Sequence, residues 1–140
     1  MAIRIEILDW ERAQPVAGPI RFAAFVEEQG VNAGVELDDN DPKCLHAVAF
    51  DGNGKAVGTG RLLPDGRIGR MAVKTEWRRL GVGAEILKAL VEAARMNGHK
   101  EVTLSAQLQA AEFYREQGFE AEGKVYQEAG ILHQLMRKKL

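Results

Sequence analysis

The residues most able to do chemistry lie in the segment Arg78-Arg79-Leu80-Gly81-Val82-Gly83-Ala84, between a predicted strand and a predicted amphipathic helix. Glycines let a ligand approach the backbone closely, and the first turn of a helix offers N–H groups that have no intrahelical partner. The helix dipole adds positive potential at the same point. Together with the two arginines, this segment predicts a site for a ligand that carries several phosphates.

Two common phosphate-binding patterns do not match this chain. A Walker loop needs Gly-Lys followed by Ser or Thr, but both Gly-Lys pairs, at residues 54–55 and 123–124, are followed by an apolar residue. The dinucleotide fingerprint needs a third glycine where this chain has Ile86. A purely structural alternative stays open, in which Gly81 and Gly83 only form a tight turn and the arginines are solvated.

Other catalytic centres have little support in the sequence. Ser105 is the only serine and Cys44 the only cysteine, and neither lies in a motif for nucleophilic hydrolysis. The three histidines lack metal-binding spacing, so we expect no metal site. The acidic run of residues 36–41 departs from a calcium loop at Pro42, which excludes an EF-hand.

The composition is that of an ordinary globular domain. The 140 residues are 46% apolar and 28% charged, with 19 basic and 20 acidic side chains and a net charge of -1. We therefore expect no nucleic-acid partner and no membrane association. A single cysteine and a start without an apolar leader favour a cytoplasmic location. Without repeats or linkers, residues 1–140 are interpreted as one domain.

Hydrophobic periodicity and turn residues predict the elements that position these groups. Strands are predicted over residues 3–8, 46–50, 56–62, 67–73, 101–106, 119–126 and 131–138, and helices over residues 20–29, 83–97 and 110–117. Asp9 is expected to cap a helical segment that Pro15, Gly18 and Pro19 interrupt. Residues 31–45 are expected to form an exposed acidic loop. The order β, α, βββ, α, β, α, ββ predicts an α+β domain with a mixed sheet.

Two motifs resemble the GNAT acetyltransferase superfamily. The pattern R-x-x-G-x-G at residues 78–83, after the strand 67–73, resembles its motif A. The pattern A-x-x-F-Y-x-x-x-G-F at residues 110–119 is similar to its signature helix beside the cofactor thiol. The resemblance implies the GNAT fold, a mixed central sheet of about six to seven strands that is splayed at the cofactor site and flanked by about four helices.

Further segments resemble the small bacterial ElaA/YjcF-like branch of that superfamily. They are residues 25–31, the stretch from Glu36 to His46, and the tail of residues 128–136. The resemblance therefore spans nearly the whole chain.

The resemblance implies acetyl-CoA as cosubstrate, lying where the strands 67–73 and 101–106 splay apart. The backbone of Met71, Ala72 and Val73 would pair with the pantetheine amides, and an amide of Met71 or Ala72 would polarise the thioester carbonyl. The pyrophosphate and its surroundings would involve Arg78, Arg79, Gly81, Val82, Gly83 and Ala84.

Near the thiol, the resemblance gives Tyr114 the role of the acid that protonates the departing thiolate. Core packing is the alternative for Tyr114, and Phe113 beside it is expected to be mainly a core residue at the edge of the cofactor site. Gln107 stands where many relatives carry an Asn that bonds the pantetheine, so this contact is open.

The acceptor side is less determined. Some relatives carry a carboxylate that acts as the general base where this chain has Gly69. The remaining candidates for the base are Glu28, Glu36, Asp38, His46, Glu128 and His133. The acidic loop is interpreted first as solvated and second as a recognition surface for a cationic amine, whereas Arg61 and Arg70 would suit an anionic group on the substrate.

The leading hypothesis is an N-acetyltransferase acting on the primary amine of a small molecule. Acetylation of a protein lysine or N-terminus, or acyl-CoA binding without catalysis, are the alternatives. A homodimer is expected if the edges of the two closing strands are exposed.

Overall fold

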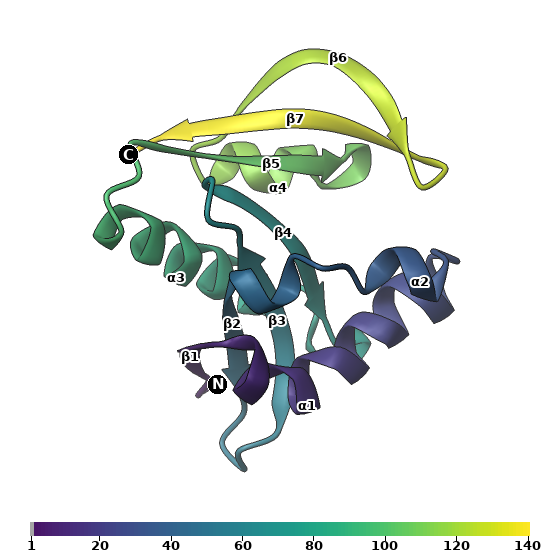
Figure 1. Ribbon diagram of the computed structural model, residues 1–140, viewed down its shortest axis with the longest axis vertical. Coiled ribbons are helices and arrows are strands. Elements are labelled where there is room, and N and C mark those ends of the chain that lie inside the picture. Colours follow the sequence, from purple (N-terminus) through teal and green to yellow (C-terminus); the bar gives the residue numbers. More distant parts are fainter. Residues whose placement is uncertain (1) are drawn as a thin grey trace.

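A computed structural model describes residues 2–140, which form one seven-stranded sheet with helices on both faces (Figure 1). The strands are β1 (Arg4–Leu8), β2 (Leu45–Phe50), β3 (Ala56–Leu62), β4 (Arg67–Val73), β5 (Glu101–Gln107), β6 (Glu120–Glu128) and β7 (Ile131–Lys139). The helices are α1 (Trp10–Arg21), α2 (Ala33–Glu36), α3 (Val82–Met96) and α4 (Ala111–Glu116). The order in the sheet is β1-β2-β3-β4-β5-β7-β6, which confirms the expected α+β class and mixed sheet.

Both faces of the central strands are buried. Along β2, Ala47 and Ala49 belong to the core under α3, whereas Val48 and Phe50 pack with α1 on the opposite face. The predicted apolar face of α3 provides the larger core. A methyl group at Gly58 of β3 would lie only 2.8 Å from Cδ1 of Ile86, so α3 rests directly on the backbone of β3.

Strands β4 and β5 confirm the expected splay. They run parallel and pair only at Arg67 with Thr103 and at Ile68 with Leu104. Beyond these pairs the strands separate, and in Figure 1 β4 diverges from the upper group of β5, β7 and β6. The edge of β4 from Gly69 to Val73 therefore has no strand partner on the β5 side.

A β-bulge lies in this open part of β4. Between two pairing positions β3 advances from Thr59 to Arg61, whereas β4 advances from Gly69 to Ala72 and so contains one extra residue. Arg70 at the bulge has a φ of +50°, in the left-handed region that non-glycine residues rarely adopt. Bulges turn peptide groups out of the regular ladder, and this one lies beside the splay.

The predicted break near the first helix is wrong. Asp9 caps α1 as expected, accepting a hydrogen bond from the backbone N–H of Arg12, but α1 continues through Pro15 and Pro19. The two prolines are four residues apart on the exposed side, where water can satisfy the freed carbonyls. The opposite side of α1 packs on the sheet, and a π-helical segment, Phe22–Glu28, continues it.

The closing hairpin has one free edge. β6 is the last strand of the sheet and all nine of its residues are exposed, whereas β7 lies between β5 and β6. The expectation of two exposed edges is therefore correct for β6 and wrong for β7. Within residues 2–140, no helix combines the length and apolar character that crossing a membrane requires.

Candidate active site

The start of α3 has the geometry of an anion site. The N-cap is Gly81, whose φ of +87° suits glycine, and no side chain caps the helix. The N–H groups of the first turn, from Val82 to Ala84, therefore have no partner within the helix. A methyl group at Gly83 would lie 3.7 Å from Cζ of Phe113, so the structure brings this loop together with α4.

Arg78 does not have the free guanidinium that the sequence suggests. Its Nε donates to the carbonyl of Val73 at the end of β4, and its two terminal nitrogens donate to the carboxylate of Glu28 at 2.7 and 2.6 Å. The hydrogen bonds from Arg78 lower the pKa of Glu28, which makes this carboxylate a weaker base. Arg78 therefore links the loop to the end of β4 and to the π-helical segment.

A cavity of about 580 Å³ opens beside the splay. It is lined by the segment from Phe25 to Asn40, by β4 including Gly69, Arg70 and Met71, by β5, and by the β6–β7 hairpin. The bulge of β4 thus faces a space that is walled by segments far apart in the sequence.

Tyr114 lies in the wall of this cavity. Its hydroxyl is 4.0 Å from Sδ of Met71, and its ring packs edge-on against Phe113 and Phe119. Burial raises the pKa of Tyr114 to about 12. The hydroxyl therefore stays protonated near neutral pH and is available as a proton donor beside Met71.

Gln107, at the end of β5, also lines the cavity. Its amide donates to Oε1 of Gln29 at 2.8 Å, and its carbonyl oxygen accepts from Gln109 at 2.6 Å. Both polar ends of Gln107 are thus engaged within the protein.

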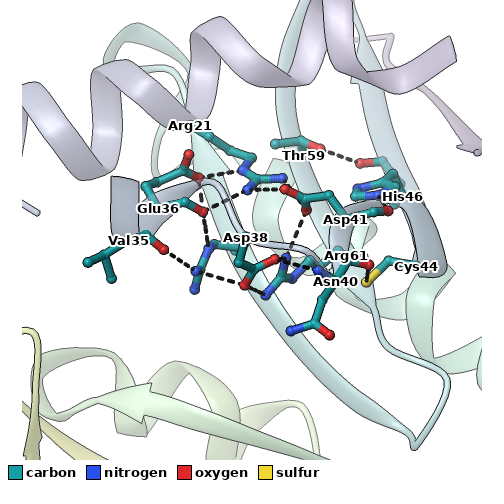
Figure 2. A network of polar contacts seen from close by, with 12 residues as sticks. Arg21, Val35, Glu36, Asp38, Asn40, Asp41, Cys44, His46, Thr59 and Arg61 are labelled. Carbon is teal, nitrogen blue, oxygen red and sulfur yellow. Dashed lines mark hydrogen bonds and ion pairs between the residues drawn. The ribbon is translucent and has the colours of Figure 1, made fainter. Parts of the chain in front are cut away.

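The expectation of an exposed acidic loop over residues 31–45 is correct for most of the segment, including Asp39, but it is wrong for Glu36 and Asp41, and residues 33–36 form the short helix α2. Arg21, Glu36 and Asp41 are almost completely buried, and Arg61 joins them (Figure 2). The Arg21 guanidinium donates to Glu36 at 2.5 Å and to both carboxylate oxygens of Asp41, at 2.9 and 3.0 Å. Local sequence carries no sign of these pairs, because 15 to 20 residues separate the partners.

The same network occupies the other charged candidates. Arg61 donates to both oxygens of Asp38 and to Asp41, and Arg70 donates to Asp38 and to the carbonyls of Val35 and Glu36. We call the charge network the set Arg21, Glu36, Asp38, Asp41, Arg61 and Arg70. Its three positive and three negative side chains balance, so neither the amine-recognition interpretation of the loop nor the anion-binding interpretation of Arg61 and Arg70 is supported.

The network also shifts the ionisation of its carboxylates. The hydrogen bonds from Arg61 hold the pKa of Asp38 well below its ordinary range. Burial would raise the pKa of Asp41, but the hydrogen bonds and charges of Arg21 and Arg61 outweigh it and lower the pKa. These carboxylates are thus poor proton acceptors at neutral pH.

Of the remaining candidate bases, only two line the cavity. His46 is buried against Trp10, and its Nε2 lies 3.0 Å from the carbonyl oxygen of Asp41, outside the cavity wall. Glu128 and His133 lie in the wall, beside Ser105 and Tyr126. The sequence gives no sign that these four residues come together. Strand alternation could have placed Ser105 with Gln107, but the register of β6 on β7 is irregular between Glu122 and Tyr126 and cannot be read from the sequence.

Comparisons of the chain with a protein family, with known sequences and with solved structures agree with one another. The model of the acetyltransferase (GNAT) domain family matches residues 17–140. The uncharacterised N-acetyltransferase YjcF of Bacillus subtilis is 39% identical over 123 residues, which cover 85% of this chain and 87% of YjcF. A crystal structure of a protein from Lactobacillus plantarum superimposes with a TM-score of 0.91 at 30% identity, covering 100% and 99% of the two chains. The crystal structure of Escherichia coli ElaA gives 0.87 at 25% identity, covering 97% and 99%.

Proposed function

Because the chain belongs to the GNAT acetyltransferase family, we propose that residues 1–140 form one domain that transfers the acetyl group of acetyl-CoA directly to the primary amine of a small molecule. The observation that carries this proposal is the cavity beside the splayed strands, with Met71 and Tyr114 in its wall. Its several walls favour a small acceptor over a protein segment, which needs an open groove.

The residues present fit acetyl-CoA. The uncapped first turn of α3, with Gly81, Val82, Gly83 and Ala84, suits the pyrophosphate, and Arg79 adds a positive charge in the same loop. The open edge of β4 at Met71, Ala72 and Val73 suits the pantetheine amides in the manner of an added strand. In this assignment Phe113 lies beside Gly83 of the loop, Gln107 lies at the thiol end, and Arg78 acts by linking the loop to Val73.

Acetyl-CoA supplies an activated acetyl group whose carbonyl oxygen gains negative charge when an amine attacks. A backbone N–H at the bulge, of Met71 or Ala72, would stabilise that charge. The Tyr114 hydroxyl would protonate the thiolate, because its raised pKa keeps the proton available throughout the neutral range.

Isothermal titration with acetyl-CoA, followed by a thiol-release assay across small amines and lysine peptides, tests this proposal. We expect binding and turnover with small amines. Turnover with lysine peptides alone would move the assignment to a protein substrate, and binding without any turnover would favour a non-catalytic acyl-CoA module. The free edge of β6 supports a homodimer, which sedimentation of the purified protein would detect.

A further inference from the structure

The β6–β7 hairpin brings four polar side chains together in the cavity wall. Glu128 and Tyr126 come from β6, His133 from β7 and Ser105 from β5. The Ser105 hydroxyl pairs with the Tyr126 hydroxyl and donates to Oε2 of Glu128 at 3.3 Å. Nε2 of His133 lies 3.7 Å from the same carboxylate oxygen. This cluster is separate from the charge network and from the loop at α3.

The hydrogen bonding of His133 determines which of its nitrogens can act. Nδ1 lies 2.7 Å from the carbonyl oxygen of Ile131, and a carbonyl can only accept, so Nδ1 carries the hydrogen. In the neutral form of the ring, Nε2 then carries the lone pair, and this nitrogen is the one that lies near Glu128. A proton taken up at Nε2 would lie beside the Glu128 carboxylate.

The charges along the cavity are otherwise compensated. Three carboxylates line it, and two of them, Glu36 and Asp38, are engaged with the guanidinium groups of the charge network. Arg67 pairs with Asp65 at 2.9 Å. Among residues 2–140, Glu128 is the carboxylate of the cavity wall that has no guanidinium partner. The uncompensated charge of the cavity is therefore negative and lies next to the imidazole of His133.

We propose that Glu128 and His133 form the acceptor site of the reaction, and that the acceptor is a cationic amine without an anionic group. This assignment rests on the proposed acetyl transfer. Glu128 attracts the ammonium, and Nε2 of His133 removes one proton to give the neutral nucleophile. Arg61 and Arg70 could bind a substrate carboxylate only by breaking the charge network.

The proton balance of the step is complete with these residues. The nitrogen lone pair forms the N–C bond, and the C–S bond breaks with its electron pair on sulfur. Two protons leave the ammonium nitrogen. One passes through His133 to solvent, and the other replaces the proton that Tyr114 gives to the thiolate.

The test compares pairs of amines that differ only in a carboxylate, such as 1,4-diaminobutane and ornithine. We expect the unmodified protein to acetylate the amine without the carboxylate with a kcat/KM at least about tenfold higher, since like charges repel at Glu128. Glu128→Gln should lower kcat/KM for 1,4-diaminobutane about fivefold or more, and Glu128→Lys should reduce or reverse the preference. If Glu128 only stabilised the fold, its substitution would leave the preference for the amine without a carboxylate unchanged.

His133→Gln should lower kcat about 100-fold with little change in the KM for acetyl-CoA, because a general base contributes roughly 10² or more. Glu122→Gln is the matched control for Glu128→Gln. It makes the same substitution on β6, at a carboxylate that pairs with Arg137 outside the cavity. It should behave as the unmodified protein. Thermal unfolding verifies folding, and Glu128 is exposed enough that its substitution should not affect it.

The outcomes separate the two proposals. If the protein acetylates amines but ornithine serves as well as 1,4-diaminobutane, or if the Glu128 and His133 variants match the unmodified protein, the acceptor assignment is overturned and acetyl transfer stands. If the unmodified protein acetylates no amine in the screen, the proposed function fails and this assignment fails with it.

Discussion

Tyr114 lies between two aromatic rings with its hydroxyl against Met71, so its chemistry depends on a buried, protonated phenol. Tyr114→Phe keeps the ring and removes only the hydroxyl. We expect kcat to fall about 100-fold, within the usual range for a general acid, and the KM for acetyl-CoA to stay within about twofold. Steady-state thiol release measures both values, and an unchanged kcat would remove the acid role.

Ionisation of this phenol should leave no trace in the neutral pH profile. Its pKa is raised to about 12 by burial, so the Tyr114 acid is lost only as the pH rises through that value. A decline of kcat between pH 8 and 10 that Tyr114→Phe abolishes would contradict this.

Arg70 offers a second test at the level of one residue. Its φ of +50° costs an alanine about 1 kcal/mol or more, whereas glycine adopts it freely. Arg70→Gly and Arg70→Ala remove the same side chain, so the difference between them reports the backbone alone. We expect the glycine variant to be more stable by about 1 kcal/mol, the reverse of the usual order in a strand. Urea unfolding measures this, and greater stability of the alanine variant would mean that the bulge does not persist.

Among the elements, the start of α3 makes the clearest prediction for cofactor binding. Asp and Asn are nearly the same size and both tolerate the left-handed conformation, so Gly81→Asp and Gly81→Asn differ mainly in charge. Nothing lies within 4 Å of a Cβ at this position, and both variants should fold. We expect Gly81→Asp to abolish acetyl-CoA binding in calorimetry and Gly81→Asn to retain part of it. Equal affinities would place the pyrophosphate elsewhere.

Elements with a clear period were predictable from the sequence. β-rich runs bounded by turn residues gave β2 to β5, and the apolar face of α3 gave that helix, to within one or two residues, because turn residues and helical periodicity are local signals. The continuation of α1 through its two prolines was not predictable, because the packing of its inner face on the sheet outweighs the tendency of proline to end a helix.

The candidate site likewise contains features that were predictable from the sequence and features that were not. The loop of residues 78–84 and the residue Tyr114 each belong to a short contiguous motif that can be read from the sequence. Their roles stay predictions, which the experiments above test. The partners of Arg78, Arg61 and Arg70 were not visible, because each ion pair joins residues at least 20 positions apart. Long-range pairing of charges depends on tertiary structure, which local sequence does not encode.

At the scale of the whole molecule, the charge network joins α1, the acidic loop, β3 and β4 into one buried unit. Asp41→Asn removes one charge from it and leaves Arg21 and Arg61 partly unpaired. We expect a loss of about 3–5 kcal/mol in the free energy of unfolding. Asp39→Asn, in the same loop but exposed, should change it by less than about 0.5 kcal/mol. A stable Asp41→Asn variant would show that the network is not needed for folding.

The network also sets the response to acid. The pKa values of Asp38 and Asp41 are lowered in the folded state, so their contribution to stability is complete above the ordinary value of 3.8 and is lost as the pH falls through the lower folded values. Melting temperatures should therefore stay level from pH 7 to about 5 and then decline. Asp41→Asn should weaken the decline, and an identical acid response would assign it to other groups.

The short contact between β4 and β5 has a further consequence for the lifetime of the protein. Only two residue pairs join the β1–β4 half of the sheet to the β5–β7 half, so few backbone hydrogen bonds connect them and side-chain packing, including that of α3, provides most of the contact. We expect the two halves to open as separate units. A ligand that lies in the splay contacts both units and adds its binding energy to the opening of either. At a ligand concentration of about one hundred times Kd this amounts to about 2.7 kcal/mol. The supply of acetyl-CoA would then govern how often the chain opens to proteases as well as how fast it turns over.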